Sequence, residues 1–187
     1  MLSKKIKKTI LTPNFMTIIR ILAIPIIIIL LMYETKTTTF IAALVFSIAS
    51  ITDYVDGYLA RTQNLSTKLG KLLDPIADKL LISSSLVMLV SLNFVPAWIA
   101  CVIIGREIII TGLRCVLIEH HQDIAASSLG KYKTGFQIAA IIPLTFHYEY
   151  FGINLNAIGL FFLYGALFFT IWSGVDYFLK TKKFVSF

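Results

Sequence analysis

Residues Asp53–Asp78 read DYVDGYLARTQNLSTKLGKLLDPIAD, a stretch that places four aspartates where two largely apolar segments meet. Asp53 and Asp56 are spaced i, i+3, and Asp74 and Asp78 are spaced i, i+4. On helices, each pair lies on one face. The stretch therefore predicts two adjacent helices, joined by a short polar loop, that present carboxylates at a similar level.

The chain around this stretch is too apolar for an ordinary soluble domain. Of its 187 residues, 57% are hydrophobic and 14% are charged, whereas soluble domains average about 25% charged residues. Lipid is therefore the expected surrounding medium. The length allows roughly six spans of about 20 residues each. The predicted fold class is all-α: a polytopic membrane protein that forms a single domain over residues 1–187.

The predicted elements follow the distribution of apolar and basic residues. Residues 1–12 are basic with one apolar side, which is typical of a short interfacial helix. Six predicted transmembrane helices follow, and they cover residues 15–33, 40–61, 69–92, 97–118, 133–146 and 155–179. Of the 17 lysines and arginines, only Lys36 falls in the turns on the side opposite the termini. The positive-inside rule therefore predicts a cell-membrane protein whose termini and four aspartates face the cytoplasm.

The net charge and the cysteines fit the same interpretation. A net charge of +7 would suggest nucleic acid as a partner of a soluble protein, but here it is explained by the positive-inside rule. No nucleic-acid partner is expected. Cys101 and Cys115 fall in one predicted span and are expected to be small apolar core residues that form no disulfide.

Four carboxylates in adjoining membrane helices require compensation, because each ionised one costs several kcal/mol in a bilayer. One interpretation pairs them with the nearby cations Arg61, Lys71 and Lys79. The other places a metal ion between them. No histidine or cysteine is nearby, so the ligands would all be oxygens, which suits Mg²⁺, Mn²⁺ or Ca²⁺ rather than zinc. We favour the metal site because the pairing interpretation must account for all four aspartates at once.

The stretch also has the pattern DxxDGxxAR, eight residues, GxxxDxxxD. This pattern resembles the signature of the CDP-alcohol phosphotransferase family without a departure. The resemblance implies an enzyme that transfers a phosphatidyl group from a CDP-activated lipid to an alcohol. It implies that Asp53, Asp56 and Asp74 bind metal, and that Asp78 completes the site and acts as the general base. Two divalent cations, Mg²⁺ or Mn²⁺, are expected at this site because two such ions can bind both the attacking and the leaving oxygens of a displacement at phosphorus. The resemblance further implies a homodimer.

The resemblance assigns further residues to the CDP-lipid site. The glycines and the Ala-Arg pair of the signature imply a lining of Gly57, Ala60, Arg61 and Gly70. Residues 13–20, PNFMTIIR, imply that Asn14, Thr17 and Arg20 belong to the nucleotide end of the site. From the residues alone, Arg61 could be a charge at a helix end. Asn14, Thr17 and Arg20 could equally be a helix cap and a lipid-headgroup anchor.

Two later segments supply cations for a phosphorylated acceptor. Residues 105–114, GREIIITGLR, contain Arg106 and Arg114 eight residues apart, on nearly the same face of a helix. Residues 130–137, GKYKTGFQ, add Lys131 and Lys133. Together the four cations predict an anion pocket in which low dielectric strengthens each charge. The two lysines could instead be positive-inside charges, and Arg106 could pair with Glu107 or with the aspartates.

Together with PNFMTIIR, these segments resemble the phosphatidylglycerophosphate synthase branch of the family. Met16 stands where leucine is commoner in that branch. The branch implies CDP-diacylglycerol and glycerol 3-phosphate as substrates, and phosphatidylglycerol phosphate and CMP as products.

Two alternatives to this activity follow from the same residues. The acceptor could be inositol phosphate, phosphatidylglycerol or serine, although serine carries no phosphate for the anion pocket. The chain could also be a divalent-cation transporter, because buried carboxylates and six spans would serve transport as well. The absence of repeated halves, the long 119–131 loop and the anion pocket all favour the enzyme.

Overall fold

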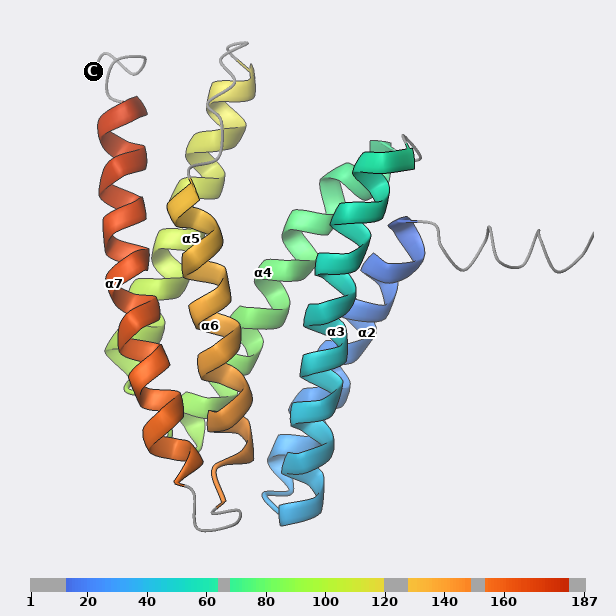
Figure 1. The fold of residues 1–187 in the computed structure, drawn as a ribbon, viewed down its shortest axis with the longest axis vertical. Helices are drawn as coiled ribbons and strands as arrows, with labels where there is room; N and C mark the ends of the chain where they lie inside the picture. Colours follow the sequence, from blue (N-terminus) through green and yellow to red (C-terminus); the bar gives the residue numbers. More distant parts are fainter. Residues whose placement is uncertain (1–12, 64–67, 120–127, 149–153, 182–187) are drawn as a thin grey trace, which may run out of the picture. The chain divides into compact units, whose positions relative to one another are not determined.

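The fold is helical in every part of the chain that the structure describes. The computed structural model describes residues 13–63, 68–119, 128–148 and 154–181 (Figure 1). These residues form six helices and no strand: α2 (Pro13–Met32), α3 (Lys36–Gln63), α4 (Lys68–Ser91), α5 (Ala97–Glu119), α6 (Ser128–Phe146) and α7 (Leu155–Thr181). The predicted all-α class is confirmed for these residues. The expected interfacial helix at residues 1–12 lies outside them.

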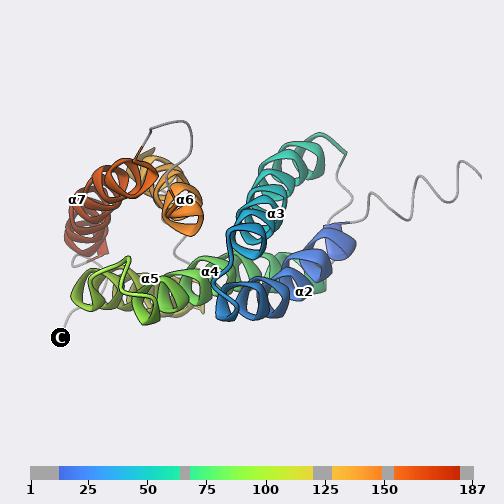
Figure 2. The same cartoon turned by 90° about the horizontal axis from the view of Figure 1, so that it is seen from below.

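The helices belong to two compact units, Met1–Met88 and Leu89–Phe187, and the boundary falls within α4. The first unit contains α2, α3 and most of α4, and α2 packs against α3. Ala42, Ala43 and Phe46 of α3 are fully buried in this unit. In the second unit, α6 packs along α7, as Figure 2 shows, and α5 packs against α7.

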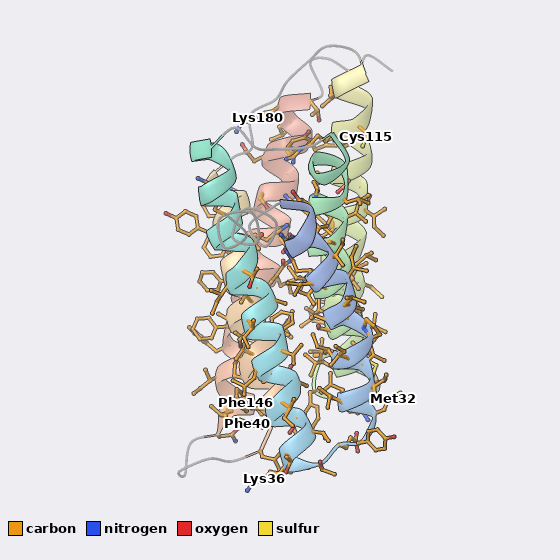
Figure 3. All side chains as sticks on the ribbon, turned by 90° about the vertical axis from the view of Figure 1, so that its right-hand side faces the viewer. Met32, Lys36, Phe40, Cys115, Phe146 and Lys180 are labelled. Carbon is orange, nitrogen blue, oxygen red and sulfur yellow. The ribbon has the colours of Figure 1, made fainter. Side chains whose placement is uncertain are left out.

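The helix α3 begins at Lys36, whereas the apolar pattern of the sequence predicted a start at residue 40. The reason is a reciprocal cap made by two threonines. The Thr38 backbone N–H donates to Thr35 Oγ1 at 3.2 Å, and the Thr35 backbone N–H donates to Thr38 Oγ1 at 3.0 Å. This capping box satisfies amide groups that a helix start leaves without partners. Because α2 ends at Met32 and α3 begins at Lys36, these two residues lie at the same end of the first unit (Figure 3).

The turn between α4 and α5 is the one predicted at residues 93–96. Asn93 has a φ of 62°, the left-handed conformation that commonly ends a helix. The backbone N–H groups of Phe94 and Val95 both donate to the Leu89 carbonyl, at 2.9 and 3.2 Å. These bonds satisfy the end of α4, and α5 starts directly after Pro96.

Glycines set the close approach of α6 and α7. A Cβ atom at Gly159 would lie 2.5 Å from Leu144 Cγ and 3.0 Å from the Leu144 backbone nitrogen. A Cβ atom at Gly165 would lie 2.6 Å from Phe136 Cδ1. Small residues that let helix backbones approach closely are typical of helix pairs in membranes.

Among the described residues, α7 is the helix that is long and apolar enough to cross a membrane by length and composition. Shorter apolar helical stretches cover Thr17–Met32 and Lys36–Thr52. Large apolar side chains on α7 are exposed, including Phe161 at 72% and Phe178 at 54%. An apolar surface of this kind is suited to contact with lipid.

The prediction that the two cysteines belong to the core is wrong. Cys101 and Cys115 of α5 are both exposed and free of a disulfide, and Cys115 lies near one end of its helix (Figure 3). Apolar character alone does not place a side chain in the core, because helices also expose many apolar side chains.

The glycine contacts predict a stability difference between two helix positions. Gly159→Ala should destabilise the protein by about 1–3 kcal/mol, because the new methyl group overlaps Leu144 and its backbone. Gly135→Ala is the matched control, since a Cβ atom there would meet nothing within 4 Å. Alanine favours a helix over glycine by roughly 1 kcal/mol at most, so this variant should melt at or above the wild-type temperature. Thermal unfolding in detergent measures both, and equal melting temperatures for the two variants would contradict the packing.

Candidate active site

The signature stretch forms the end of α3 and the start of α4, as the sequence predicts. Asp53 and Asp56 lie within α3, and Asp74 and Asp78 lie within α4. Asp53, Asp56 and several predicted CDP-lipid residues have side chains outside the described part of the structure. This applies to Asn14, Ala60 and Arg61, and the surroundings of Gly57 and Gly70 are likewise not described.

A hydrogen bond connects α2 to the aspartate pair of α4. Thr17 Oγ1 donates to Asp74 Oδ1. Thr17 is 1% exposed, so its hydroxyl is held in the interior of the first unit. Arg20 lies one turn further along α2 and is also buried. The structure therefore brings Thr17, which the sequence places at the nucleotide end, into contact with a predicted metal ligand.

The donor atoms of α4 suit a hard divalent cation. Asp74 and Asp78 are both half-buried and lie one helical turn apart. Pro75 between them lies inside the helix and cannot donate a backbone hydrogen bond to the residue one turn before it. Within the described side chains, no group of three or more histidine, cysteine or acidic residues gathers. The described donors are oxygens only, and they fit Mg²⁺ or Mn²⁺.

A second polar cluster lies in the other unit and joins α5, α6 and α7. Lys133 Nζ donates to Glu107 Oε1, and Arg106 Nη1 donates to the same oxygen at 3.2 Å. Arg106 Nη2 donates to Ser173 Oγ at 3.0 Å. We call Arg106, Glu107, Lys133 and Ser173 the basic cluster. Its charges sum to +1, because one carboxylate accompanies two cations.

The basic cluster is largely removed from solvent. Lys133 is 5% exposed and Glu107 is 9% exposed. A buried ammonium group needs a counter-charge, and Glu107 supplies it. Arg106 passes over Gly174 of α7, where a Cβ atom would lie 3.4 Å from Arg106 Cγ. Arg106 therefore packs closely along α7 next to Ser173.

The four predicted acceptor cations separate into two groups. Arg106 and Lys133 meet at Glu107 within the basic cluster. Arg114 and Lys131 have exposed side chains. Within the part of the chain that is described, neither of these two forms an ion pair with Glu107. Lys131 and Lys133 lie inside α6, which begins at Ser128 rather than at Lys133 as predicted.

Sequence reasoning missed two members of the basic cluster. Glu107 was considered as a partner of Arg106 only, and its contact with Lys133 crosses between helices. Ser173 lies in the apolar sequence of α7 and was not considered. A signal was available, because a serine among apolar residues of a membrane helix commonly forms a hydrogen bond with a neighbouring helix.

The match to known proteins covers most of the chain. A sequence model of the family described as CDP-alcohol phosphatidyltransferase matches residues 10–172. The chain belongs to this family. The family resemblance carried by the signature stretch is thereby confirmed, and the chain is a phosphatidyltransferase. Members of the CDP-alcohol phosphatidyltransferase family are membrane enzymes and generally depend on divalent cations.

Individual relatives are similar over nearly their whole length. A Bacillus subtilis protein named CDP-diacylglycerol–glycerol-3-phosphate 3-phosphatidyltransferase is 43% identical, over 90% of this chain and 93% of its own. A Rickettsia bellii protein of the same name is 40% identical, over 92% of this chain and 96% of its own. A protein of the same name from Escherichia coli K12 is 36% identical, over 88% of this chain and 91% of its own.

The contact between Thr17 and Asp74 predicts a change in metal dependence. Thr17→Val removes the hydroxyl that orients the carboxylate, while it preserves the shape of the side chain. The Mg²⁺ concentration for half-maximal phosphatidyltransferase activity should rise by about tenfold, the usual effect of losing a partner of a metal ligand. Thr17→Ser keeps the hydroxyl and should stay close to wild type. If the metal titrations of the valine and serine variants coincide, the hydroxyl does not support the metal site.

Proposed function

We propose that the protein transfers the phosphatidyl group of CDP-diacylglycerol to the primary hydroxyl of glycerol 3-phosphate. The products are phosphatidylglycerol phosphate and CMP. One observation carries the proposal: relatives named for this reaction are 36–43% identical to the chain, in alignments that cover about nine tenths of it. The basic cluster supports it, since a phosphorylated acceptor needs cations that a neutral alcohol would not require.

The aspartates of the signature are proposed to hold the metal. Asp53, Asp56, Asp74 and Asp78 would bind two divalent cations, Mg²⁺ or Mn²⁺. When bound, such ions neutralise the negative charge that develops on phosphate oxygens during displacement at phosphorus. The all-oxygen chemistry of the described pair on α4, and the Thr17 hydroxyl that holds Asp74, support this assignment.

Asp78 is the proposed general base. It accepts the proton of the acceptor hydroxyl, whose oxygen forms a bond to the phosphorus that carries the diacylglycerol. The bond from this phosphorus to the bridging oxygen of CMP breaks, and CMP leaves with that oxygen. Asp78 is half-buried, so its carboxylate is partly shielded from bulk water and can still be reached by the acceptor hydroxyl.

The remaining site residues are proposed to bind the two substrates. Asn14, Thr17, Gly57, Ala60, Arg61 and Gly70 would hold the CDP-lipid, with Arg61 as a bidentate donor to phosphate. Arg106, Arg114, Lys131 and Lys133 would bind the phosphate of the acceptor. The burial of Arg106 and Lys133 favours them as the inner pair, because charges act more strongly at low dielectric.

We also propose how the chain lies in the membrane. Six transmembrane helices would place both termini and the aspartates on the cytoplasmic side, where glycerol 3-phosphate is available. The positive-inside rule supports this orientation, because Lys36 is the one lysine or arginine in the predicted turns on the side opposite the termini. CDP-diacylglycerol would enter from the lipid. A homodimer is proposed from the family resemblance alone.

A defined assay tests the proposed reaction. The purified protein in detergent should release CMP only when CDP-diacylglycerol, glycerol 3-phosphate and Mg²⁺ or Mn²⁺ are all present, because each is required for the displacement. Inositol phosphate, phosphatidylglycerol and serine, tested as acceptors with the same lipid, should give little CMP. Strong CMP release with one of these acceptors and none with glycerol 3-phosphate would overturn the acceptor assignment. Activity without a membrane gradient excludes a transporter.

The role of Asp78 is tested in the same assay. Asp78→Asn should lower the rate of CMP release by roughly 10²–10⁴-fold, the usual contribution of a positioned general base. Asp176→Asn is a matched control, since it makes the same change in a half-buried residue that lies far along the chain and pairs with Lys180 at 2.7 Å. Near wild-type activity of Asp78→Asn would show that another group accepts the proton.

A further inference from the structure

Glu107 is the residue on which the basic cluster depends. Its Oε1 atom accepts hydrogen bonds from Arg106 on the same helix and from Lys133 on α6. Both contacts lie in a region where the members are largely buried. A carboxylate thus lies inside the group of cations that the proposed reaction uses for an anionic acceptor, where it would at first be expected to compete with the substrate.

The geometry of Arg106 shows that Glu107 does not occupy all of the donors. Arg106 uses Nη1 for Glu107 and Nη2 for Ser173, while its buried Nε has no hydrogen-bond partner. Two further polar side chains on the same helices are buried without partners at one atom each. They are Gln137 Nε2, one turn from Lys133 on α6, and Thr170 Oγ1, one turn from Ser173 on α7.

The basic cluster therefore has a net charge of +1, and the buried donors Arg106 Nε and Gln137 Nε2 have no hydrogen-bond partner. A buried donor without an acceptor is costly and is uncommon in proteins. An oxyanion is the chemical group that would satisfy both the charge and the donors.

We propose that Glu107 is a positioning residue for acceptor binding. It holds Arg106 and Lys133 together, so that the net positive charge of the basic cluster and the Arg106 Nε donor are available to the phosphate of the acceptor. Without this carboxylate, two cations in a poorly solvated region repel each other, and the lysine turns toward solvent. The proposal rests on the proposed function, since it assumes a phosphorylated acceptor.

Glu107→Gln tests the proposal because it removes the charge and keeps the shape. The KM for glycerol 3-phosphate should rise by at least about tenfold, as expected when one partner of a buried charge pair is lost. The kcat and the KM for CDP-diacylglycerol should change by less than about threefold, since Glu107 belongs to neither the proposed metal site nor the proposed CDP-lipid site. Asp176→Asn serves as the acid-to-amide control outside the basic cluster and should leave all three values unchanged.

Inorganic phosphate provides a second measurement that separates positioning from folding. It should compete with glycerol 3-phosphate in the wild type, and its inhibition should weaken in Glu107→Gln by about the same factor as the KM rises. Equal losses for both substrates together with a lower melting temperature would assign Glu107 a structural role and overturn the proposal. A lower KM with a lower kcat would also overturn it, because Glu107 would then be a competing anion.

The outcome is separable from that of the proposed function. If the wild type prefers another phosphorylated alcohol, the proposed function fails, and the same variants test Glu107 with that alcohol. If the wild type uses glycerol 3-phosphate and Glu107→Gln has an unchanged KM, the proposed function stands and the role of Glu107 is refuted.

Discussion

An ionised side chain inside an apolar helix requires a counter-charge or a set of hydrogen bonds, and this requirement organises the described polar residues of the protein. The cost of leaving such a group alone reaches several kcal/mol. Asp74 meets the requirement in part through the hydroxyl of Thr17, and Lys133 meets it through Glu107. In both cases the partner comes from a different helix, so each charge also fixes the position of a neighbouring element.

These lateral bonds matter because lipid gives helices little hydrophobic reason to associate. Thr17 links α2 to α4 within the first unit, and Glu107 links α5 to α6 within the second. The bond from Arg106 to Ser173 adds α7. Close glycine contacts, and ring contacts of Phe136 with Phe162 and Phe169, join α6 to α7. The groups proposed for chemistry are therefore also groups that hold their helices together.

The helices could be predicted closely from the sequence because apolar length and charged interruptions are both local signals. The start of α3 was missed because the polar residues around Lys36 were placed in a turn, whereas Thr35 and Thr38 cap the helix. The start of α6 was missed because the residues before Lys133 lack the continuous apolar character of a span. Helix ends depend on individual hydrogen bonds, which a hydropathy pattern does not contain.

The contacts of the candidate site were less predictable than its residue types. The spacing of Asp74 and Asp78 follows from helix geometry, but their contact with Thr17 depends on how α2 packs. Likewise, Arg106 and Glu107 are neighbours in sequence, whereas Lys133 reaches Glu107 only through the packing of α6. The burial of the two cysteines was predicted wrongly for another reason. An apolar residue is nearly as stable against lipid as in a protein core, so its apolar character does not predict whether it is buried.

The proposed division between carboxylates and cations has a consequence for catalysis. In the proposed reaction, the phosphate of glycerol 3-phosphate passes unchanged into the product, so its charge is the same in substrate, transition state and product. Interactions with it are uniform and contribute to binding and orientation rather than to the chemical step. Charge changes only at the transferred phosphorus and at the attacking hydroxyl. In this proposal, acceleration of the reaction would therefore come from the aspartates and the cations they would bind, whereas the basic cluster would determine which alcohol is held for attack.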